Sequence, residues 1–269
     1  MAEYLRITEK RTLQTAVHQY QHPETGRRVT LVATMTFGDP GYYIGLREVI
    51  NDREAAGAVV HCAGSGRVPD DPAISEPREQ LPASRAELMV LNAWRDCRDL
   101  EVARFPTIGW VHKDVWLEPR PQWEVHDLSD LAIIRLAGLP LITQVVACKV
   151  RLFGPPKGPT ALKWLRFKIS LAMRTMASPK VQGRQVLIDE IRYRNTVALT
   201  AFSATGRDTV LVWGAAHIPG LDNGIRKAGL RHTGTDWHTV TEIPRLWNLL
   251  HKPPSTTAAQ QFACRRPGR

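Results

Sequence analysis

His217 stands where a histidine can perform acid–base chemistry. The apolar run Val210 to Trp213 in DTVLVWGAAHIPGLDNGIRKAG predicts a buried strand that ends at Gly214, followed by a turn holding His217 and a helix from near Pro219. Ligands bind at the carboxyl ends of strands in open α/β sheets, and an imidazole placed there can accept or donate a proton. The alternative for His217 is a helix-capping or purely structural role.

Arg194 and Asn195 form a second candidate pair, in a helix predicted from Arg184 to Ala204. Arg194 projects into the apolar sector of this helix, and Asn195 lies at its edge. The apolar stripe consists of Leu187, Ile191, Ala198 and Phe202. A guanidinium there needs a partner. Glu190 could supply a structural pair four residues away, whereas a cavity-facing Arg194 would suit carboxylate or enolate oxygens of a ligand.

The opening of the chain predicts the sheet that positions these residues. The β-rich segments 12–21 and 28–36 flank HPETGR, a hairpin turn. Asp39 and Pro40 predict the start of a helix, with Asp39 as the N-cap and a catalytic role as its alternative. GAVVHCA (57–63) predicts a short buried strand. The resulting strand, helix, strand order predicts an α/β fold with a central mixed sheet flanked by helices.

We expect one α/β domain over residues 1–251, with a helical insertion around 84–180 and a flexible basic tail over 252–269. Residues 64–84 are rich in Gly and Pro and predict a long loop, a lid in one interpretation, before a helix resumes near Ser84. Residues 127–137 also have helical spacing. The segment 160–177 predicts a basic amphipathic helix, which we interpret as packed on the core in preference to a membrane surface.

The composition is that of an ordinary globular chain, with 43% hydrophobic and 23% charged residues in a length of 269. It excludes collagen-like and disordered proteins. Lys and Arg (36) exceed Asp and Glu (26) by 10, so the surface should attract anions. This charge is spread along the chain without a zinc-finger spacing or an aromatic RNA-binding motif, and we therefore expect no specific nucleic acid partner.

The spacing of the cysteines and the length of the apolar runs indicate the cellular compartment of the protein. The four cysteines are far apart with no C-x-x-C pair, which favours reduced thiols over disulfides or structural zinc. They are Cys62, Cys97, Cys148 and Cys264. No apolar run of about 18 residues occurs, and Met1 to Lys10 lacks a signal-type apolar core. We expect a cytoplasmic protein without a transmembrane segment.

Three segments together resemble the TraB/PrgY/GumN/Tiki family, which is related to the erythromycin-esterase-like and ChaN-like folds. VTLVATMTFGDPGYYIGLREVI is similar to the family's opening block, and AGAVVHCAGSG to the strand that usually ends in a glutamate. VLVWGAAHIPGLDNGIRKAGLRHTGTDWHTV is similar to the closing block with its Gly-x-x-His, and IRYRNTVALTAF to the helix with an Arg-Asn pair. The resemblance implies a pocket lined by Thr36, Asp39, Tyr42, Tyr43, His61 and Asn195.

The chain departs from the family at the residues that are proposed to bind a metal there. Thr36 stands where the first histidine is expected and Ala63 where the glutamate is expected, so His217 alone remains. A catalytic metal needs about three protein ligands, and His61 with His217 would leave the coordination short. The sequence therefore predicts a site without metal or cofactor.

These residues predict two main classes of function. The first is a metal-independent enzyme in which His217 is the acid or base and Arg194 stabilises an oxyanion, for dehydration, isomerisation or conjugate-addition cyclisation of a bulky small molecule in specialised metabolism. The second is a non-catalytic pseudoenzyme or ligand-binding protein on the same scaffold, and a residual metal-dependent hydrolase is a further alternative. The expected partners are a small-molecule substrate or ligand and, as an option, a second copy of the chain in a homodimer.

Overall fold

The computed structural model describes residues 3–64, 82–154, 165, 167–169, 172 and 189–243, without the side chains of residues 189 and 190. The expected tail 252–269, most of the loop 64–84 and most of the predicted helix 160–177 lie outside the described residues. Within that helix, Leu165 and Ile169 are described and are buried.

A mixed sheet forms the centre of the fold, as the sequence predicts. The expected hairpin is confirmed as β2 (Thr12–Gln21) and β3 (Arg28–Thr34), which pair antiparallel. Parallel strands extend the sheet from β3 in the order β8 (Thr209–Gly214), β5 (Val59–Cys62) and β7 (Glu124–Val125). β1 (Leu5–Ile7) and β9 (Arg231–Glu242) both pair with β2. β8 lies between two parallel neighbours, and helices on both faces of the sheet bury its run Val210 to Trp213.

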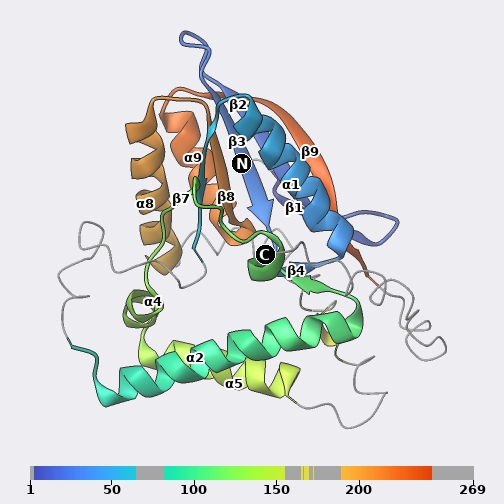
Figure 1. The fold of residues 1–269 in the computed structure, drawn as a ribbon, viewed down its shortest axis with the longest axis vertical. Coiled ribbons are helices and arrows are strands. Elements are labelled where there is room, and N and C mark those ends of the chain that lie inside the picture. The colour runs from blue at the N-terminus through green and yellow to red at the C-terminus, as the bar shows by residue number, and fades with distance from the viewer. Residues whose placement is uncertain are drawn as a thin grey trace.

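Helices cover both faces of the sheet (Figure 1). α1 (Pro40–Ala55) packs on one face, and α8 (Asp189–Thr205) with α9 (Ile218–Lys227) lies against the other. α9 follows β8 through the short helix η2 (Ala215–His217), so His217 occupies the predicted strand-to-helix turn. Asp39 occupies the N-cap position of α1 as predicted, but the expected capping hydrogen bond is wrong because its side chain makes none. Its Oδ1 instead accepts from the Thr241 hydroxyl of β9 at 3.2 Å.

The described residues of the segment expected as a helical insertion, 84–154 with a few residues up to 172, form helices and two short strands. The segment contains the helices α2 (Arg85–Arg104), η1 (Phe105–Ile108), α3 (Lys113–Trp116), α4 (Asp130–Ala137) and α5 (Leu139–Phe153). α2 begins near Ser84, as the sequence predicts, and the structure adds a capping box between Ser84 and Glu87. The segment also supplies β6 (Val111–His112), which pairs with β4 (Phe37–Gly38), and the edge strand β7 of the main sheet. α2 and α5 lie across the end of the sheet to which β3 points (Figure 1).

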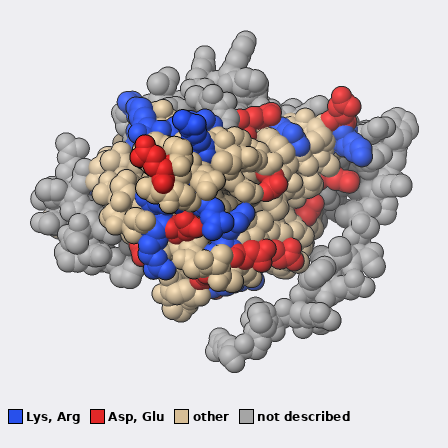
Figure 2. Space-filling model, turned by 90° about the horizontal axis from the view of Figure 1, so that it is seen from above, with Lys and Arg blue, Asp and Glu red and all other residues tan. Residues whose placement is uncertain are grey.

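The surface of the described part carries mixed charges. Figure 2 shows basic and acidic side chains interspersed on the face seen from above. Among the described residues, no single helix is both long and apolar enough to cross a membrane. α4 and α5 reach the required length only as a pair, across a bend of 112°.

Tyr42 secures the turn between β3 and α1. Its buried hydroxyl donates to the Ala33 carbonyl at 3.1 Å and accepts from the Met35 N–H at 3.2 Å and from the Thr15 hydroxyl at 2.9 Å. We predict that Tyr42→Phe lowers the free energy of unfolding by about 1–3 kcal/mol, because buried backbone groups lose a partner. Chemical denaturation measures this change.

Ile44→Ala is the matched control for Tyr42→Phe, since Ile44 lies on the same helix and is 39% exposed. The control should stay within about 0.5 kcal/mol of the parent protein. Equal stability of the two variants would contradict the role given to the Tyr42 hydroxyl.

Candidate functional site

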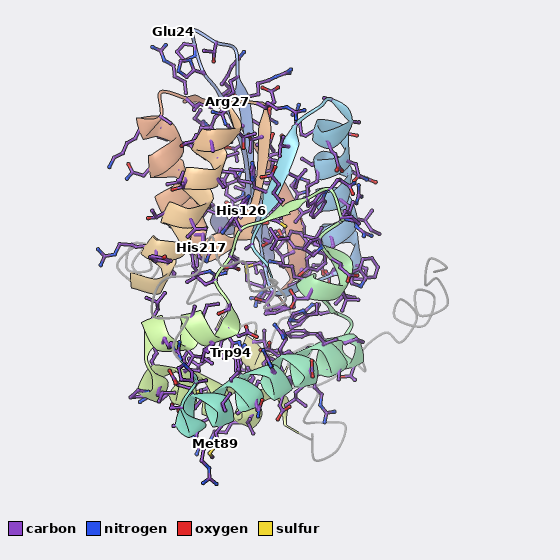
Figure 3. All side chains as sticks on the ribbon, turned by 60° about the vertical axis from the view of Figure 1, so that its left-hand side comes forward. Glu24, Arg27, Met89, Trp94, His126 and His217 are labelled. Atoms are coloured by element: carbon purple, nitrogen blue, oxygen red, sulfur yellow. The ribbon has the colours of Figure 1, made fainter. Side chains whose placement is uncertain are left out.

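Polar residues gather at the carboxyl ends of the parallel strands. β3, β8 and β5 end at Thr34, Gly214 and Cys62, and the segments that follow them or cross over them carry the side chains. We name this group the strand-end cluster, and its members are Cys62, Lys113, Asp127, Arg194, Asn195 and His217. Ligand sites of open α/β sheets lie at this end of the strands. Figure 3 shows His217 beside α8, on the side of the sheet end that faces the α2 layer.

The hydrogen bond between His217 and Asn195 fixes the tautomer of the imidazole. Nδ1 of His217 lies 2.8 Å from Oδ1 of Asn195. An amide oxygen can only accept, so Nδ1 carries the proton and Nε2 carries the lone pair in the neutral ring. No hydrogen-bond partner of Nε2 occurs among the residues that the structure describes. The bond therefore leaves His217 with a lone pair that can accept a proton.

Burial keeps this imidazole neutral. His217 is 5% exposed, and desolvation lowers its pKa well below the usual value, with further lowering by the positive charges of Arg194 and Lys113. A buried imidazolium next to two cations is unfavourable. At neutral pH the ring is a hydrogen-bond donor at Nδ1 and an acceptor at Nε2.

Arg194 is held by a carboxylate that the sequence analysis missed. Its Nε and Nη2 donate to the two oxygens of Asp127, each at 2.7 Å. Asp127 is 1% exposed and Arg194 is 17% exposed. The Glu190 side chain, which we expected as the structural partner, lies outside the described residues. The pair joins α8 to the segment between β7 and α4, and it places Asn195, the next residue of α8, beside His217.

Lys113 and Cys62 complete the strand-end cluster. The backbone N–H of Lys113 donates to the Thr36 carbonyl at 2.8 Å, which brings this lysine from α3 to the end of β3. Its positive charge acts on both His217 and Cys62. Burial nevertheless raises the pKa of the Cys62 thiol to about 12, with Asp127 opposing ionisation as well. Cys62 is therefore a protonated thiol, unsuited to a nucleophilic role.

The tyrosines expected in the pocket are structural in their contacts. Tyr42 and Tyr43 are buried, and the Tyr43 hydroxyl donates to the Met35 carbonyl at 2.8 Å. Both hydroxyls therefore serve the backbone of the turn after β3. Asp39 contacts β9, and the Thr36 side chain is exposed. Of the six residues expected in the pocket, Asn195 is the one whose side chain the structure brings into contact with His217.

His61 lies in a different group from His217. It is on the face of β5 opposite to Cys62, and its Nε2 is 3.0 Å from the hydroxyl of Thr205, the last residue of α8. Arg194 is 11 residues earlier in α8, roughly 16 Å along the helix axis. Burial lowers the pKa of His61. The structure thus separates His61 from the wall of the strand-end cluster.

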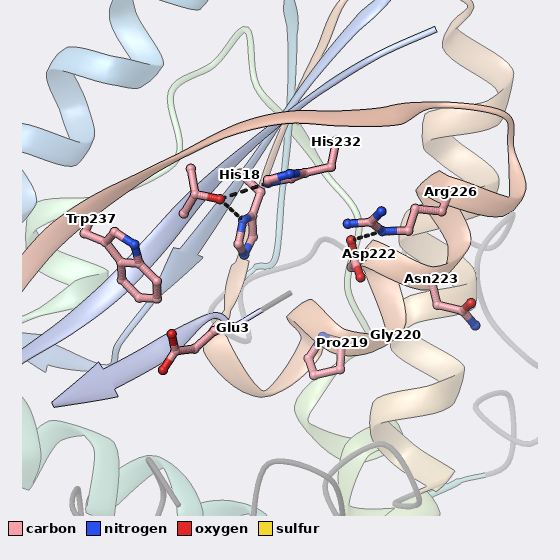
Figure 4. Close-up of a pocket in the computed structure, with 10 residues that line it drawn as sticks. Glu3, His18, Pro219, Gly220, Asp222, Asn223, Arg226, His232 and Trp237 are labelled. Carbon is pink, nitrogen blue, oxygen red and sulfur yellow. Dashed lines mark hydrogen bonds and ion pairs between the residues drawn. The ribbon is translucent and has the colours of Figure 1, made fainter. Parts of the chain in front are cut away.

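A groove of about 770 Å³ lies between β2, β9 and the start of α9 (Figure 4). His18 Nδ1 and His232 Nε2 converge on the Thr235 hydroxyl at 2.9 and 2.8 Å. The lining residues are Glu3, His18, Pro219, Gly220, Asp222, Asn223, Arg226, His232, Thr235 and Trp237. Neither His217 nor Arg194 belongs to them. The groove is a second place where a small molecule could bind.

We predict that His217 contributes to the pH dependence of stability. Because its pKa in the folded state lies well below 6.5, the unfolded chain binds a proton that the native state does not as the pH falls below that value. Stability therefore decreases with falling pH. His217→Gln removes this contribution, and the slope of the unfolding free energy below about pH 6.5 should become shallower by up to about 1.4 kcal/mol per pH unit.

Denaturant titrations from pH 7 to 5 test this, with the partly exposed Ile44→Ala as the control because it changes no ionisable group. Ile44→Ala should leave the slope unchanged. An identical slope in His217→Gln and the parent protein would show that folding does not lower the pKa of His217.

The strand-end cluster is known from its geometry alone, because comparison of the chain with protein-family models, with curated proteins and with solved structures finds no match. The resemblance to the TraB/PrgY/GumN/Tiki family remains a prediction of the sequence.

Proposed function

We propose that this chain is an enzyme that transfers protons without a metal, with His217 as the acid–base residue of the strand-end cluster. The observation that carries the proposal is the His217–Asn195 hydrogen bond at 2.8 Å, which leaves a lone pair on Nε2 close to two cations. Metal ligation suits this cluster poorly. Both oxygens of Asp127 accept from Arg194, and the Cys62 thiol is held protonated.

The chemistry that fits is proton abstraction beside a carbonyl. Nε2 of His217 takes a proton from the carbon, the electron pair of the broken C–H bond forms a C=C bond, and the π pair of the carbonyl moves to its oxygen to give an enolate. Asn195 keeps its bond to Nδ1 and stabilises the imidazolium that forms. His217 then returns the proton to another carbon, or to a departing hydroxyl that leaves as water. These steps correspond to isomerisation and dehydration, and ring closure by conjugate addition uses the same transfers.

The charges of the strand-end cluster favour an anionic substrate. Arg194 and Lys113 lower the pKa of His217 in the free protein. A carboxylate or a developing enolate between them would offset their charge and raise the basicity of the imidazole, so the base becomes stronger when the substrate is bound. Arg194 acts through its charge and through the position that Asp127 gives it. We propose a bulky carbonyl compound of specialised metabolism, processed in the cytoplasm, as the substrate.

The test compares metabolites of cells that carry the parent protein, His217→Gln or no gene. We expect a precursor to accumulate without the gene and with His217→Gln, because loss of an acid–base residue typically costs about 10²–10⁴-fold in rate. With the identified precursor, turnover should persist in the presence of a chelator and in the control His22→Gln. Unchanged turnover in a folded His217→Gln protein would refute the proposal.

Ligand binding without catalysis is the second candidate function, and the groove of Figure 4 favours it. The groove combines a tryptophan, two histidines and an arginine in about 770 Å³, a volume in the range of small-molecule sites. Arg226 donates to Asp222 at 2.7 Å and is thereby oriented beside the groove. A non-catalytic member of this fold would bind its ligand there.

Native mass spectrometry of the protein after incubation with a cell extract separates the two candidates. A binder predicts that a retained small molecule is lost from Trp237→Ala and kept by His217→Gln. The enzyme proposal predicts that Trp237→Ala leaves the retained molecules unchanged, because its site is the strand-end cluster. Retention by neither parent nor variants would remove the support for the groove as a ligand site.

A further inference from the structure

Three metal-ligating side chains converge at the edge of the sheet, outside the strand-end cluster. His61 of β5 and Glu124 of β7 are direct partners in the parallel register, and His126 follows two residues after Glu124 on the same side. Oε2 of Glu124 lies 3.2 Å from His61 Nδ1 and 3.2 Å from His126 Nε2. One ligand atom from each residue lies within 4.8 Å of the others.

The contacts of Thr205 fix the protonation of His61. The Thr205 hydroxyl donates its one proton to the Ala201 carbonyl at 3.0 Å, so it accepts from Nε2–H of His61, also at 3.0 Å. Nδ1 of the neutral ring then carries the lone pair. This nitrogen is buried, and it has no hydrogen-bond partner among the described residues. It faces the carboxylate of Glu124, so two lone pairs oppose each other with no proton between them.

We propose that His61, Glu124 and His126 bind a divalent transition metal, for which Zn²⁺ is the reference ion. Tetrahedral Zn²⁺ with ligands at about 2.0–2.2 Å places ligand atoms about 3.3–3.6 Å apart. The two distances to Glu124, each 3.2 Å, are close to this spacing before any ion is added. Two imidazoles and one carboxylate suit zinc better than calcium or magnesium, which prefer sites made of oxygen alone. The bound cation would accept the lone pair of the buried Nδ1 of His61, which has no hydrogen-bond partner among the described residues.

The exposure of the three residues defines the open side of the site. His61 is completely buried, whereas the side chains of His126 and Glu124 are 19% and 51% exposed. The fourth position of the ion therefore faces solvent and accepts water. Thr205 takes the role of the outer partner that orients a metal-binding histidine. The ion joins the two-residue strand β7 to β5, directly before Asp127.

Zinc titration of chelator-treated protein by calorimetry tests the site, with Co²⁺ absorption as a report on the ligand geometry. We expect one equivalent of Zn²⁺ and a tetrahedral Co²⁺ spectrum. Glu124→Gln and His126→Ala, which change partly exposed side chains, should each weaken binding by at least about tenfold. Thr205→Val should weaken it by about 10–100-fold, because the orienting partner is lost while the ligands remain.

Glu118→Gln and His22→Gln are the matched controls, and both should bind Zn²⁺ as the parent protein does. Circular dichroism confirms that each variant is folded. Absence of stoichiometric binding, or equal affinity of the parent protein, Glu124→Gln and His126→Ala, would overturn the proposal. The ligands exclude His217, so removal of the ion should lower the melting temperature without removing the acid–base residue.

Discussion

The buried ion pair between Asp127 and Arg194 is the constraint on which the strand-end cluster depends. The guanidinium donates to both oxygens of a carboxylate that is 1% exposed, and the Leu128 N–H donates to Oδ1 as well. Removal of one partner from such an ion pair typically costs about 3–5 kcal/mol. The pair connects segments 67 residues apart in the sequence. It fixes α8 relative to the end of the sheet, and Asn195 thereby reaches the imidazole of His217.

Charge and burial then act together on His217. The ring is enclosed by η2, α8 and the strand ends, so its charged form is disfavoured, and Lys113 adds to the effect of Arg194. The same position that makes a free imidazolium unfavourable suits a substrate that brings negative charge. The proposed metal site stabilises this arrangement indirectly, since β7 leads into Asp127.

Local patterns predicted the elements that carry His217 and Arg194, but the contacts between distant segments could not be found from spacing. The run Val210 to Trp213 and the hairpin were predictable because buried central strands are continuously apolar and hairpin turns use Pro and Gly. β7 has two residues, too few for any periodicity, so Glu124 and Asp127 were missed. Lys113 lies in a Trp-rich segment without regular spacing. The predicted N-cap role of Asp39 is wrong because its side chain accepts a hydrogen bond from Thr241 of β9 and makes none to the first turn of α1.

Measurement of the His217 tautomer is the sharpest test of the proposed chemistry, which needs a proton on Nδ1 and a lone pair on Nε2. Nitrogen-15 NMR of histidine-labelled protein distinguishes the two ring nitrogens, and His217→Gln assigns the resonances. At neutral pH we predict a neutral ring with a protonated Nδ1, and Asn195→Ala should reduce the population of this tautomer because its hydrogen-bond acceptor is lost. An imidazolium at neutral pH, or a ring protonated at Nε2 in the parent protein, would contradict the proposed chemistry.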